Sequence, residues 1–391
     1  MQAVHSESLL SLVGVTARDG FLGVIEMLQQ SARLMSIFMP ARGVFGDWPE
    51  LDNKIEAFRL FQSADRELRL PVDRLPLDEV TQRALAGDAF RAIWMLEGVG
   101  YIKATASSLS VKGLLTEGPG ANLPDRAMIP LHAGMGTAFG EKLFGGLDSR
   151  PSRAQVRDTV QRFVDVCRAN CRPGWEDACI ESAGLAVRLL YPSLLAPMSA
   201  EMEIISPALR PLYWHGVGRS LYFQPMNFLP IAGAHRRMLN SAAQETSSPE
   251  DRRNVLAGLT WAVTLVNLPQ PAVIRSLASV CSELKMRDEF INGLISALLA
   301  WRHMAPVDLR YINDYTRPLA THDRQAVLWN QWIETPAREA LANVFPGLER
   351  RNNIPSLYTF RTSEELGSLS EELVAKATKS QRTRKAAHPT P

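Results

Sequence analysis

Cysteine is scarce in this chain, which has 4 cysteines in 391 residues. So few cannot build a disulfide framework, and a chain without one is typical of a reducing cytoplasm. Cys167, Cys171 and Cys179 lack the paired CxxC spacing of a zinc site, so we predict that they are small buried residues. The first residues include Glu7 and no basic leader, which argues against a secretory signal.

A large excess of one charge is also absent. The formal net charge is +2, which excludes a nucleic-acid binder that relies on a broadly basic surface. Much of the basic character lies in residues 376–391, "KATKSQRTRKAAHPTP", which have no apolar face. We predict that this segment is a disordered tail.

Long uncharged runs are missing, with one exception at residues 254–274, "NVLAGLTWAVTLVNLPQPAVI". The run is long enough to span a bilayer, but Pro269 and Pro271 break it, and Asn267 and Gln270 add polar groups. We therefore expect a buried helix followed by an extended turn, and no transmembrane segment.

Alternating strand patterns are nearly absent, whereas apolar residues recur three and four apart, for example over residues 21–39 and 153–169. Helix start signals occur at Ser206 and, in "SSPEDRR", before Asn254. Residues 107–127 are the longest non-helical stretch, either a surface loop or a small hairpin. Hydrophobic residues make up 46% of the chain and can fill one large core, so we predict an all-α protein with a single large helical domain.

A short glycine-containing motif is repeated ahead of apolar helical runs. The clear copies are "EGVG" at residues 97–100, "AGMG" at 133–136, "ESAG" at 181–184 and "HGVG" at 215–218, and weaker copies are "AGLT" from 257 and "NGLI" from 292. The clear copies lie roughly 35 to 50 residues apart, the length of a two-helix repeat. A glycine inside a helix costs about 1 kcal/mol relative to alanine, so we interpret these pairs as places where two helix backbones touch.

The motif copies divide the chain into four parts. We predict an N-terminal helical cap at residues 1–90, a repeat-like core at 91–305, a C-terminal helical segment at 306–375 and the basic tail at 376–391. In the core, glycine-punctuated helices form a ring or stack in which each helix crosses its neighbours at small residues.

The order "EGVG", "ESAGLAVRLL", "HGVGRSLYF", "LAGLTWAVTLVN" resembles the UnbL-type family of unknown function, which is encoded in the conserved cassettes of enediyne polyketide biosynthesis. That family has similar glycine-punctuated helical segments, including a Gly-x-Gly-Arg-Ser-aromatic core like Gly216 to Tyr222. The resemblance covers about residues 94–274. It implies a setting in secondary metabolism rather than a particular reaction.

Polar residues open several copies of the motif. Glu97, Glu181 and His215 are the first residues of their copies, three positions before the glycine that ends each copy. His132 lies four positions before Gly136, the glycine that ends its copy. If the repeats superpose, these side chains converge in an apolar setting, where carboxylates and imidazoles have shifted pKa values. Glu97, Glu181 and His215 are therefore candidate catalytic acids and bases. The alternative is that each caps a helix or satisfies a buried backbone group.

Arg219, Asp177 and His132 are candidate ligand-binding residues. Arg219 is four residues from His215 and shares a helix face with it, so this pair either binds a carboxylate or phosphate or joins a structural ion pair with Glu97, Glu181 or Asp177. Asp177 stands four residues before Glu181, and two like charges on one face need a positive partner: Arg219, Arg188 or a cation. No HExxH-like pattern accompanies them, so we expect no metal site, and the sequence does not identify a cofactor.

Two functions fit these patterns. The first is a soluble biosynthetic protein of secondary metabolism, enzyme or accessory, that holds an apolar polyketide-like molecule in a cavity between central helices. The second is a helical protein–protein interaction scaffold without catalytic activity. The expected partners are an apolar small molecule or a biosynthetic partner protein, and no nucleic acid. An enclosed apolar pocket bordered by the candidate residues favours the first function, and a filled core with an exposed apolar groove favours the second.

Overall fold

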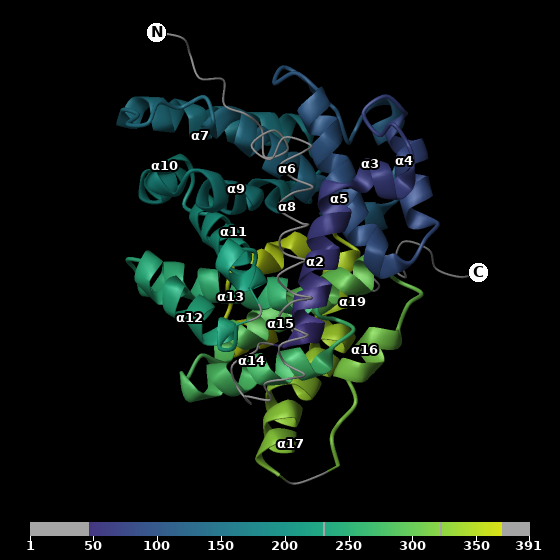
Figure 1. The fold of residues 1–391 in the computed structure, drawn as a ribbon, viewed down its shortest axis with the longest axis vertical. Helices are drawn as coiled ribbons and strands as arrows, with labels where there is room; N and C mark the ends of the chain where they lie inside the picture. Colours follow the sequence, from purple (N-terminus) through teal and green to yellow (C-terminus); the bar gives the residue numbers. More distant parts are fainter. Residues whose placement is uncertain (1–46, 230, 321–322, 370–391) are drawn as a thin grey trace, which may run out of the picture.

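The computed structural model describes residues 47–229, 231–320 and 323–369. Within these residues no strand occurs and every regular element is helical, which confirms the all-α prediction. Figure 1 shows the helices packed into one domain. The helix predicted at residues 21–39 and the tail predicted at 376–391 lie outside the described residues.

The α-helices of the described chain run from α2 to α19. Their bounds are α2 Trp48–Gln62, α3 Ala64–Leu68, α4 Leu77–Leu85, α5 Ala89–Ala106, α6 Met128–Phe144, α7 Arg153–Asn170, α8 Glu176–Ile180, α9 Ser182–Leu190, α10 Leu195–Ile205, α11 Leu209–Tyr222, α12 Ala234–Glu245, α13 Pro249–Val266, α14 Pro271–Glu283, α15 Arg287–Met304, α16 Arg310–Tyr315, α17 Arg324–Trp329, α18 Thr335–Glu339 and α19 Phe345–Glu349. Single π-helical turns, Asn330–Glu334 and Ala340–Val344, flank α18, and a 3-10 helix follows at Ile354–Tyr358.

The repeated motif lies on or directly before α5, α6, α9, α11, α13 and α15, which we call the central helices. Most of them are buried on nearly every side, and in α6 every residue except Lys142 is buried. A helix that is apolar all round must be surrounded by other protein. Successive central helices pack directly against one another, and in Figure 1 they follow in chain order from α6 near the top to α15 below.

Outer helices separate most of the central ones: α7 and α8 lie between α6 and α9, and α10, α12 and α14 each lie between two later central helices. The outer helix α7 is amphipathic, because it buries Val156, Val160 and Phe163 while most of its remaining side chains are charged or polar. A capping box between Ser152 and Gln155 starts this helix. From α9 onward, one central and one outer helix alternate, which is the two-helix unit that the spacing of the motif predicts, whereas a loop rather than an outer helix joins α5 to α6.

Three local predictions have clear outcomes. The run at residues 254–274 is a buried helix, α13, followed by a turn before α14, as expected. Residues 107–127 form a loop with short 3-10 turns rather than a hairpin. The start predicted at Ser206 is wrong, because Ser206 ends α10 and α11 begins only at Leu209.

Neighbouring central helices touch through small residues in a regular pattern. The first glycine of a copy lies against the backbone carbonyl of the residue that opens the previous copy. The pairs are Gly134 with Glu97, Gly216 with Glu181, Gly258 with His215 and Gly293 with Ala257. The second glycine lies against the following helix, in the pairs Gly100 with Leu131, Gly136 with Cys179, Gly184 with Tyr213 and Gly218 with Val255. A Cβ at any of these glycines would overlap a carbonyl oxygen, so the close approach requires glycine.

One copy replaces its first glycine with Ser182 and shows that the pattern has a polar version. The Ser182 hydroxyl donates a 2.9 Å hydrogen bond to the carbonyl oxygen of Ala133, the residue before the first glycine of the previous copy. The interpretation of the repeats as backbone contacts between helices is therefore confirmed.

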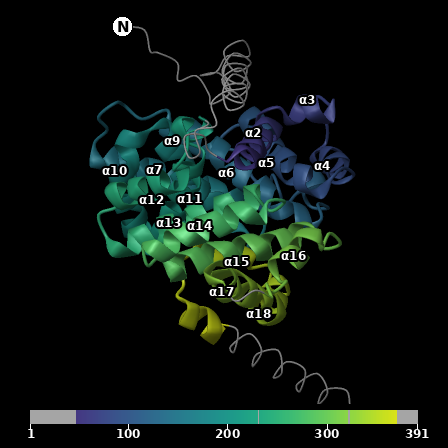
Figure 2. The same ribbon diagram turned by 60° about the horizontal axis from the view of Figure 1, so that its bottom comes forward.

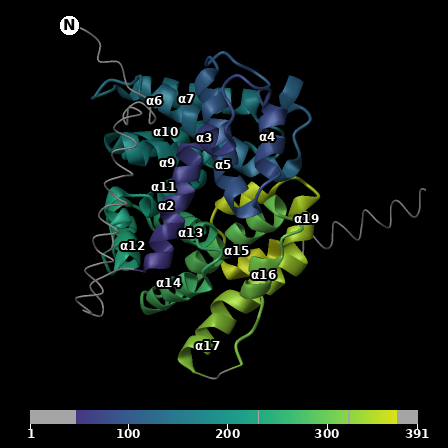
Figure 3. The same cartoon turned by 45° about the vertical axis from the view of Figure 1, so that its right-hand side comes forward.

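The predicted cap and C-terminal segment are both joined to the core. Helix α2 packs on α5 and reaches α13, and Gly98 of α5 lies against the carbonyl of Phe61 on α2. Figures 2 and 3 show α3 and α4 at one end of the molecule and α17 at the other. The chain then returns inward, and Ile354–Tyr358 contacts α8, α11, α13 and α15. Among the described helices, none combines the length and apolar character needed to cross a bilayer.

Candidate functional site

The glycine contacts give certain residues equivalent places on successive central helices. These are the residues whose carbonyl group meets the following helix: Glu97, Ala133, Glu181, His215 and Ala257. Because the backbone contact is the same each time, their side chains leave the helices at corresponding points. The polar ones, Glu97, Glu181 and His215, are the residues that the sequence predicts to converge.

Four side chains form one buried polar network. Arg219 lies between two carboxylates: its Nη1 donates to Glu181 Oε2 at 2.6 Å, and its Nη2 donates to Glu97 Oε1 at 2.9 Å. His215 Nδ1 lies 2.7 Å from Glu181 Oε1. All four residues are buried, and Glu97 is the most exposed at 8%. The structure thus brings together the three candidate catalytic residues and Arg219.

Aromatic rings enclose one side of this network. The His215 ring stacks on Tyr358, with centroids 4.9 Å apart and planes inclined by 13°, and Trp261 meets both rings edge to face. The Arg219 guanidinium lies 4.8 Å from the centre of the Trp261 ring. These contacts hold the imidazole and the guanidinium in place and keep water away from them.

The contacts determine the protonation of His215 and Glu181. Burial alone would raise the pKa of Glu181, but the Arg219 charge and the hydrogen bond from His215 hold that pKa below its usual value. Burial lowers the pKa of His215 against the opposing effect of Glu181. Glu181 is therefore an ionised acceptor, and neutral His215 donates its Nδ1 proton to it. The other ring nitrogen, Nε2, is buried without a hydrogen-bond partner in the described chain.

Glu97 differs from Glu181 although both contact Arg219. Burial raises the pKa of Glu97, and the nearby Glu181 charge adds to this rise, so Arg219 offsets it only in part. Arg219 is shared by two carboxylates, and it stabilises the ionised form of Glu181 more strongly because its hydrogen bond to Glu181 is the shorter one. Glu97 is therefore the carboxyl group of the network that most readily holds a proton.

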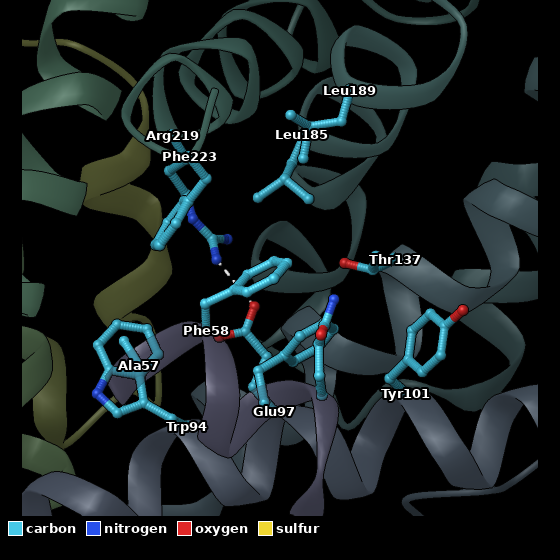
Figure 4. A pocket seen from close by; sticks show the side chains of 12 residues that line it. Ala57, Phe58, Trp94, Glu97, Tyr101, Thr137, Leu185, Leu189, Arg219 and Phe223 are labelled. Atoms are coloured by element: carbon cyan, nitrogen blue, oxygen red, sulfur yellow. Dashed lines mark hydrogen bonds and ion pairs between the residues drawn. The ribbon is translucent and has the colours of Figure 1, made fainter. Parts of the chain in front are cut away.

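A cavity lies beside Glu97 and Arg219 (Figure 4). Its volume is about 70 Å³. Its wall is mainly apolar and consists of Ala57, Phe58, Phe61, Gln62, Trp94, Glu97, Tyr101, Thr137, Leu185, Leu189, Arg219 and Phe223. Glu97 and Arg219 are the charged residues of this wall, and Figure 4 shows them facing each other across a hydrogen bond.

Glu181 and His215 do not line this cavity, so two of the four network residues, Glu97 and Arg219, border it. The reason is the aromatic cover, because Tyr358 and Trp261 occupy the space beside the His215 ring. His215 and Glu181 therefore hold Arg219 on the side away from the cavity, and Glu97 and Arg219 form the side of the network that faces the cavity.

The repeat also accounts for part of the cavity wall. The residues four positions after Glu97, Ala133, Glu181 and His215 are Tyr101, Thr137, Leu185 and Arg219, and all four line the cavity. Four residues complete about one helical turn, so these side chains lie next to the backbone contacts on each central helix. This relation was present in the sequence, but it was not used to select candidate residues.

His132 is a structural residue outside the network. Its Nδ1 lies 2.7 Å from the carbonyl oxygen of Met128, and its Nε2 lies 3.1 Å from the backbone nitrogen of Arg172. A backbone N–H can only donate, so Nε2 accepts and Nδ1 carries the proton. Burial lowers the pKa of His132 to about 4. The imidazole is thus neutral, with both nitrogens satisfied, and does not reach a ligand cavity.

Asp177 also lies apart from the network. Burial raises the pKa of Asp177, and its stabilising charge is Arg361 rather than Arg219. The positive partner of Glu181 is Arg219, whereas Arg188 forms a 2.7 Å bidentate pair with Glu245. Of the alternatives left open by the sequence, the structural ion pair between Arg219 and the two glutamates is the one observed.

Two important residues, Trp261 and Tyr358, were not among the candidates. Trp261 stands four positions after Ala257, so it occupies the place that Arg219 occupies in the preceding copy, and the repeat pattern could have identified it. Tyr358 follows the last copy and carries no local signal, because its contact with His215 joins distant parts of the chain.

The four cysteines are buried and form no disulfide, and the burial of Cys167, Cys171 and Cys179 confirms the prediction for these three. No cluster of ligands suitable for a metal ion occurs among the described residues. Comparisons with protein-family models, with curated proteins and with solved structures each found no match. The chemistry of this site must therefore be inferred from its own contacts.

Proposed function

We propose that this protein binds an apolar small molecule in the cavity beside the polar network and that Glu97 exchanges a proton with it. The observation that supports this proposal is the placement of Glu97 and Arg219 as the charged groups on an otherwise mainly apolar wall. Binding sites of this kind combine apolar side chains with a few polar groups that orient the ligand.

The network favours a neutral ligand over an anionic one. Arg219 already donates to two carboxylates, so it has little remaining attraction for a carboxylate or phosphate. A protonated Glu97 can instead donate to a neutral acceptor such as a ketone oxygen. An unsaturated polyketide-like molecule has such carbonyl groups along an apolar body, which agrees with the family resemblance and with a role in secondary metabolism. We place this role in the cytoplasm, as the scarcity of cysteine suggests.

Each network residue then has a separate role. Glu97 is the proton donor and acceptor, because burial raises its pKa, so it holds a proton more readily than Glu181. Arg219 positions the Glu97 carboxyl through the 2.9 Å hydrogen bond. Glu181 fixes Arg219, and His215 fixes Glu181. The half-buried side chains of Phe58, Leu185 and Phe223 form the rim, along which the rest of a longer ligand would lie.

Binding is tested with prodan, a neutral fluorescent naphthyl ketone. We expect its emission to change on binding to the wild type and the affinity to fall about tenfold or more in Leu185→Trp, because the indole fills the cavity. Leu190→Trp on the same helix is the matched control, since Leu190 is half-buried and does not line the cavity. Equal affinities in the two variants would contradict the proposed site. Absence of binding to the wild type would favour the interaction-scaffold function.

Proton exchange is tested separately by following deuterium incorporation next to the prodan carbonyl in D2O by NMR. We expect the wild type to accelerate this exchange and Glu97→Gln to lose the acceleration while still binding prodan, because glutamine keeps the shape but not the titrating proton. An unchanged exchange rate in Glu97→Gln would show that Glu97 has no chemical role.

A further inference from the structure

A second buried polar cluster surrounds Lys54 on α2, away from the network just described. Lys54 is 1% exposed, and its Nζ donates a 2.9 Å hydrogen bond to the carbonyl oxygen of Asn227. The same nitrogen lies 4.0 Å from the centre of the Tyr222 ring and 4.0 Å from Glu50 Oε1. Glu50 in turn lies 3.1 Å from His235 Nε2.

The ammonium form of Lys54 is poorly satisfied in this position. An ammonium group has three N–H donors, and Asn227 O is the acceptor within hydrogen-bond distance among the described residues. Glu50 at 4.0 Å is too distant for a direct hydrogen bond. Burial therefore favours the neutral amine, which has a free lone pair and is a nucleophile.

The amine also borders a small cavity of its own. The cavity has a volume of about 20 Å³. It reaches the surface at Asp47 and Ile231, which are exposed, and it is lined by Asp47, Glu50, Leu51, Lys54, Asn227, Leu229, Ile231 and Ala234. This is room for about one water molecule, so a carbonyl compound would place its carbonyl group in the cavity and its alkyl chain toward the opening at Asp47 and Ile231.

The lining restricts the kind of molecule that can react there. Asp47 and Glu50 give the cavity an acidic wall, which disfavours an anion, while Leu51, Leu229 and Ile231 give it an apolar one. A short neutral carbonyl compound satisfies both conditions. We propose that Lys54 is a covalent site that forms an imine with a short aliphatic aldehyde entering this cavity.

The proposed step balances without an oxidant or a further reactant. The Nζ lone pair attacks the carbonyl carbon, forming the N–C bond, while the C=O π electrons move to oxygen. A proton then passes from nitrogen to that oxygen, and water leaves as the C=N bond forms. Glu50, held by His235, is the nearest carboxylate to the amine, and its negative charge stabilises the positively charged nitrogen that forms during the attack.

The acidities agree with this chemistry. Burial lowers the pKa of Lys54 to about 8, although the Glu50 charge opposes the change. At pH 8 about half of Lys54 is then the free amine, against less than about 1% of a lysine with the ordinary pKa near 10.5. Burial alone would raise the pKa of Glu50, but His235 and Lys54 hold it at about 2, so Glu50 is ionised and places a negative charge near the amine.

The test treats the wild-type chain with propanal and sodium cyanoborohydride at pH 8 and maps the propylated lysines by peptide mass spectrometry. We expect Lys54 to be modified about tenfold faster than the exposed Lys112, because of its larger fraction of free amine. Modification of exposed lysines with Lys54 left unmodified would overturn the proposal. This measurement needs no variant and does not depend on the function proposed for the first cavity.

A pair of variants tests the route into the cavity. Ile231→Trp places an indole at the rim, and we expect it to slow modification of Lys54 at least about fivefold through steric exclusion. Ile204→Trp is the matched control, because Ile204 is 50% exposed, close to the 45% of Ile231, and does not line the cavity. Equal rates at Lys54 in the two variants would show that the aldehyde does not enter here, and would overturn the assigned site.

Discussion

At the scale of single residues, Arg219 is the centre of the polar network because it joins two carboxylates that would otherwise be buried together. Glu97 and Glu181 both depend on its charge, and Trp261 covers its face. The Nε atom of Arg219 is buried without a partner in the described chain, so even this residue is not fully satisfied. Such a network is sensitive to loss of one member, because each remaining charge is left in an apolar setting.

The Arg219→Met variant should lose about 3–5 kcal/mol of unfolding free energy, since it leaves two buried carboxylates without a counter-charge. Urea unfolding measures the change. Arg236→Met is the control, because Arg236 pairs with Glu283 at the surface, where loss of a pair changes stability by less than about 1 kcal/mol. Similar losses in the two variants would show that burial of the network has little energetic consequence.

His132 gives a second prediction at this scale, the pH dependence of stability. Its folded-state pKa of about 4 lies below the ordinary value of 6.5, so the unfolded chain takes up the proton first as the pH falls. Stability is therefore complete above pH 6.5 and is lost toward pH 4, by about 2 kcal/mol between pH 7 and pH 5. The lowered pKa of His215 acts in the same direction. Urea unfolding at several pH values should show that the unfolding free energy of His132→Gln changes less between pH 7 and pH 5 than that of the wild type. An unchanged pH dependence would contradict the lowered pKa of His132.

At the scale of the helix, the backbone contacts between central helices decide which substitutions are tolerated. Glycine in a helix interior is usually unfavourable, yet here it allows two helices to meet at a carbonyl group. Not every glycine on these helices has this role. Gly140 also lies on α6, but a Cβ there would be 3.0 Å from a ring carbon of Phe144, a side chain that can adjust.

The variants Gly134→Ala and Gly140→Ala separate these roles on one helix. Gly134→Ala should lower the unfolding free energy by about 2–4 kcal/mol, because its Cβ would overlap the Glu97 carbonyl and push α5 and α6 apart. Gly140→Ala should change it by less than about 1 kcal/mol, since alanine favours the helix and Phe144 can move. Thermal and urea unfolding of both variants measure this difference, and equal stabilities would show that α5 and α6 can separate freely at Gly134.

At the scale of the whole molecule, the packing of the central helices could be predicted from the sequence. The packing of the C-terminal residues Ile354–Tyr358 against those helices could not. The pairs of small residues on α5, α6, α9 and α11 are local signals of close helix contact, and the residues next to them correctly indicated the network. The covering of His215 by Tyr358 depends on how the chain returns after α19, which no local pattern records. For that reason nothing in the sequence indicated that an aromatic ring covers His215.

Tyr358 should therefore be important for the stability of the entire domain. Tyr358→Ala should lower the unfolding free energy by about 3–5 kcal/mol, because it removes a fully enclosed ring from between His215 and Trp261. Tyr311→Ala is the control, since Tyr311 is only partly buried. Denaturant unfolding measures both. If Tyr358→Ala were no less stable than Tyr311→Ala, the C-terminal segment would not hold the core together.

The late position of Tyr358 in the chain also has a consequence for protein synthesis. Each central helix contacts the one before it, so α5 to α15 can assemble in order as they leave the ribosome. Ile354–Tyr358 is translated after all of them, yet it contacts α8, α11, α13 and α15. The nascent chain must therefore keep a nearly assembled core with His215 uncovered until this segment emerges, which is the interval when a chaperone would protect it.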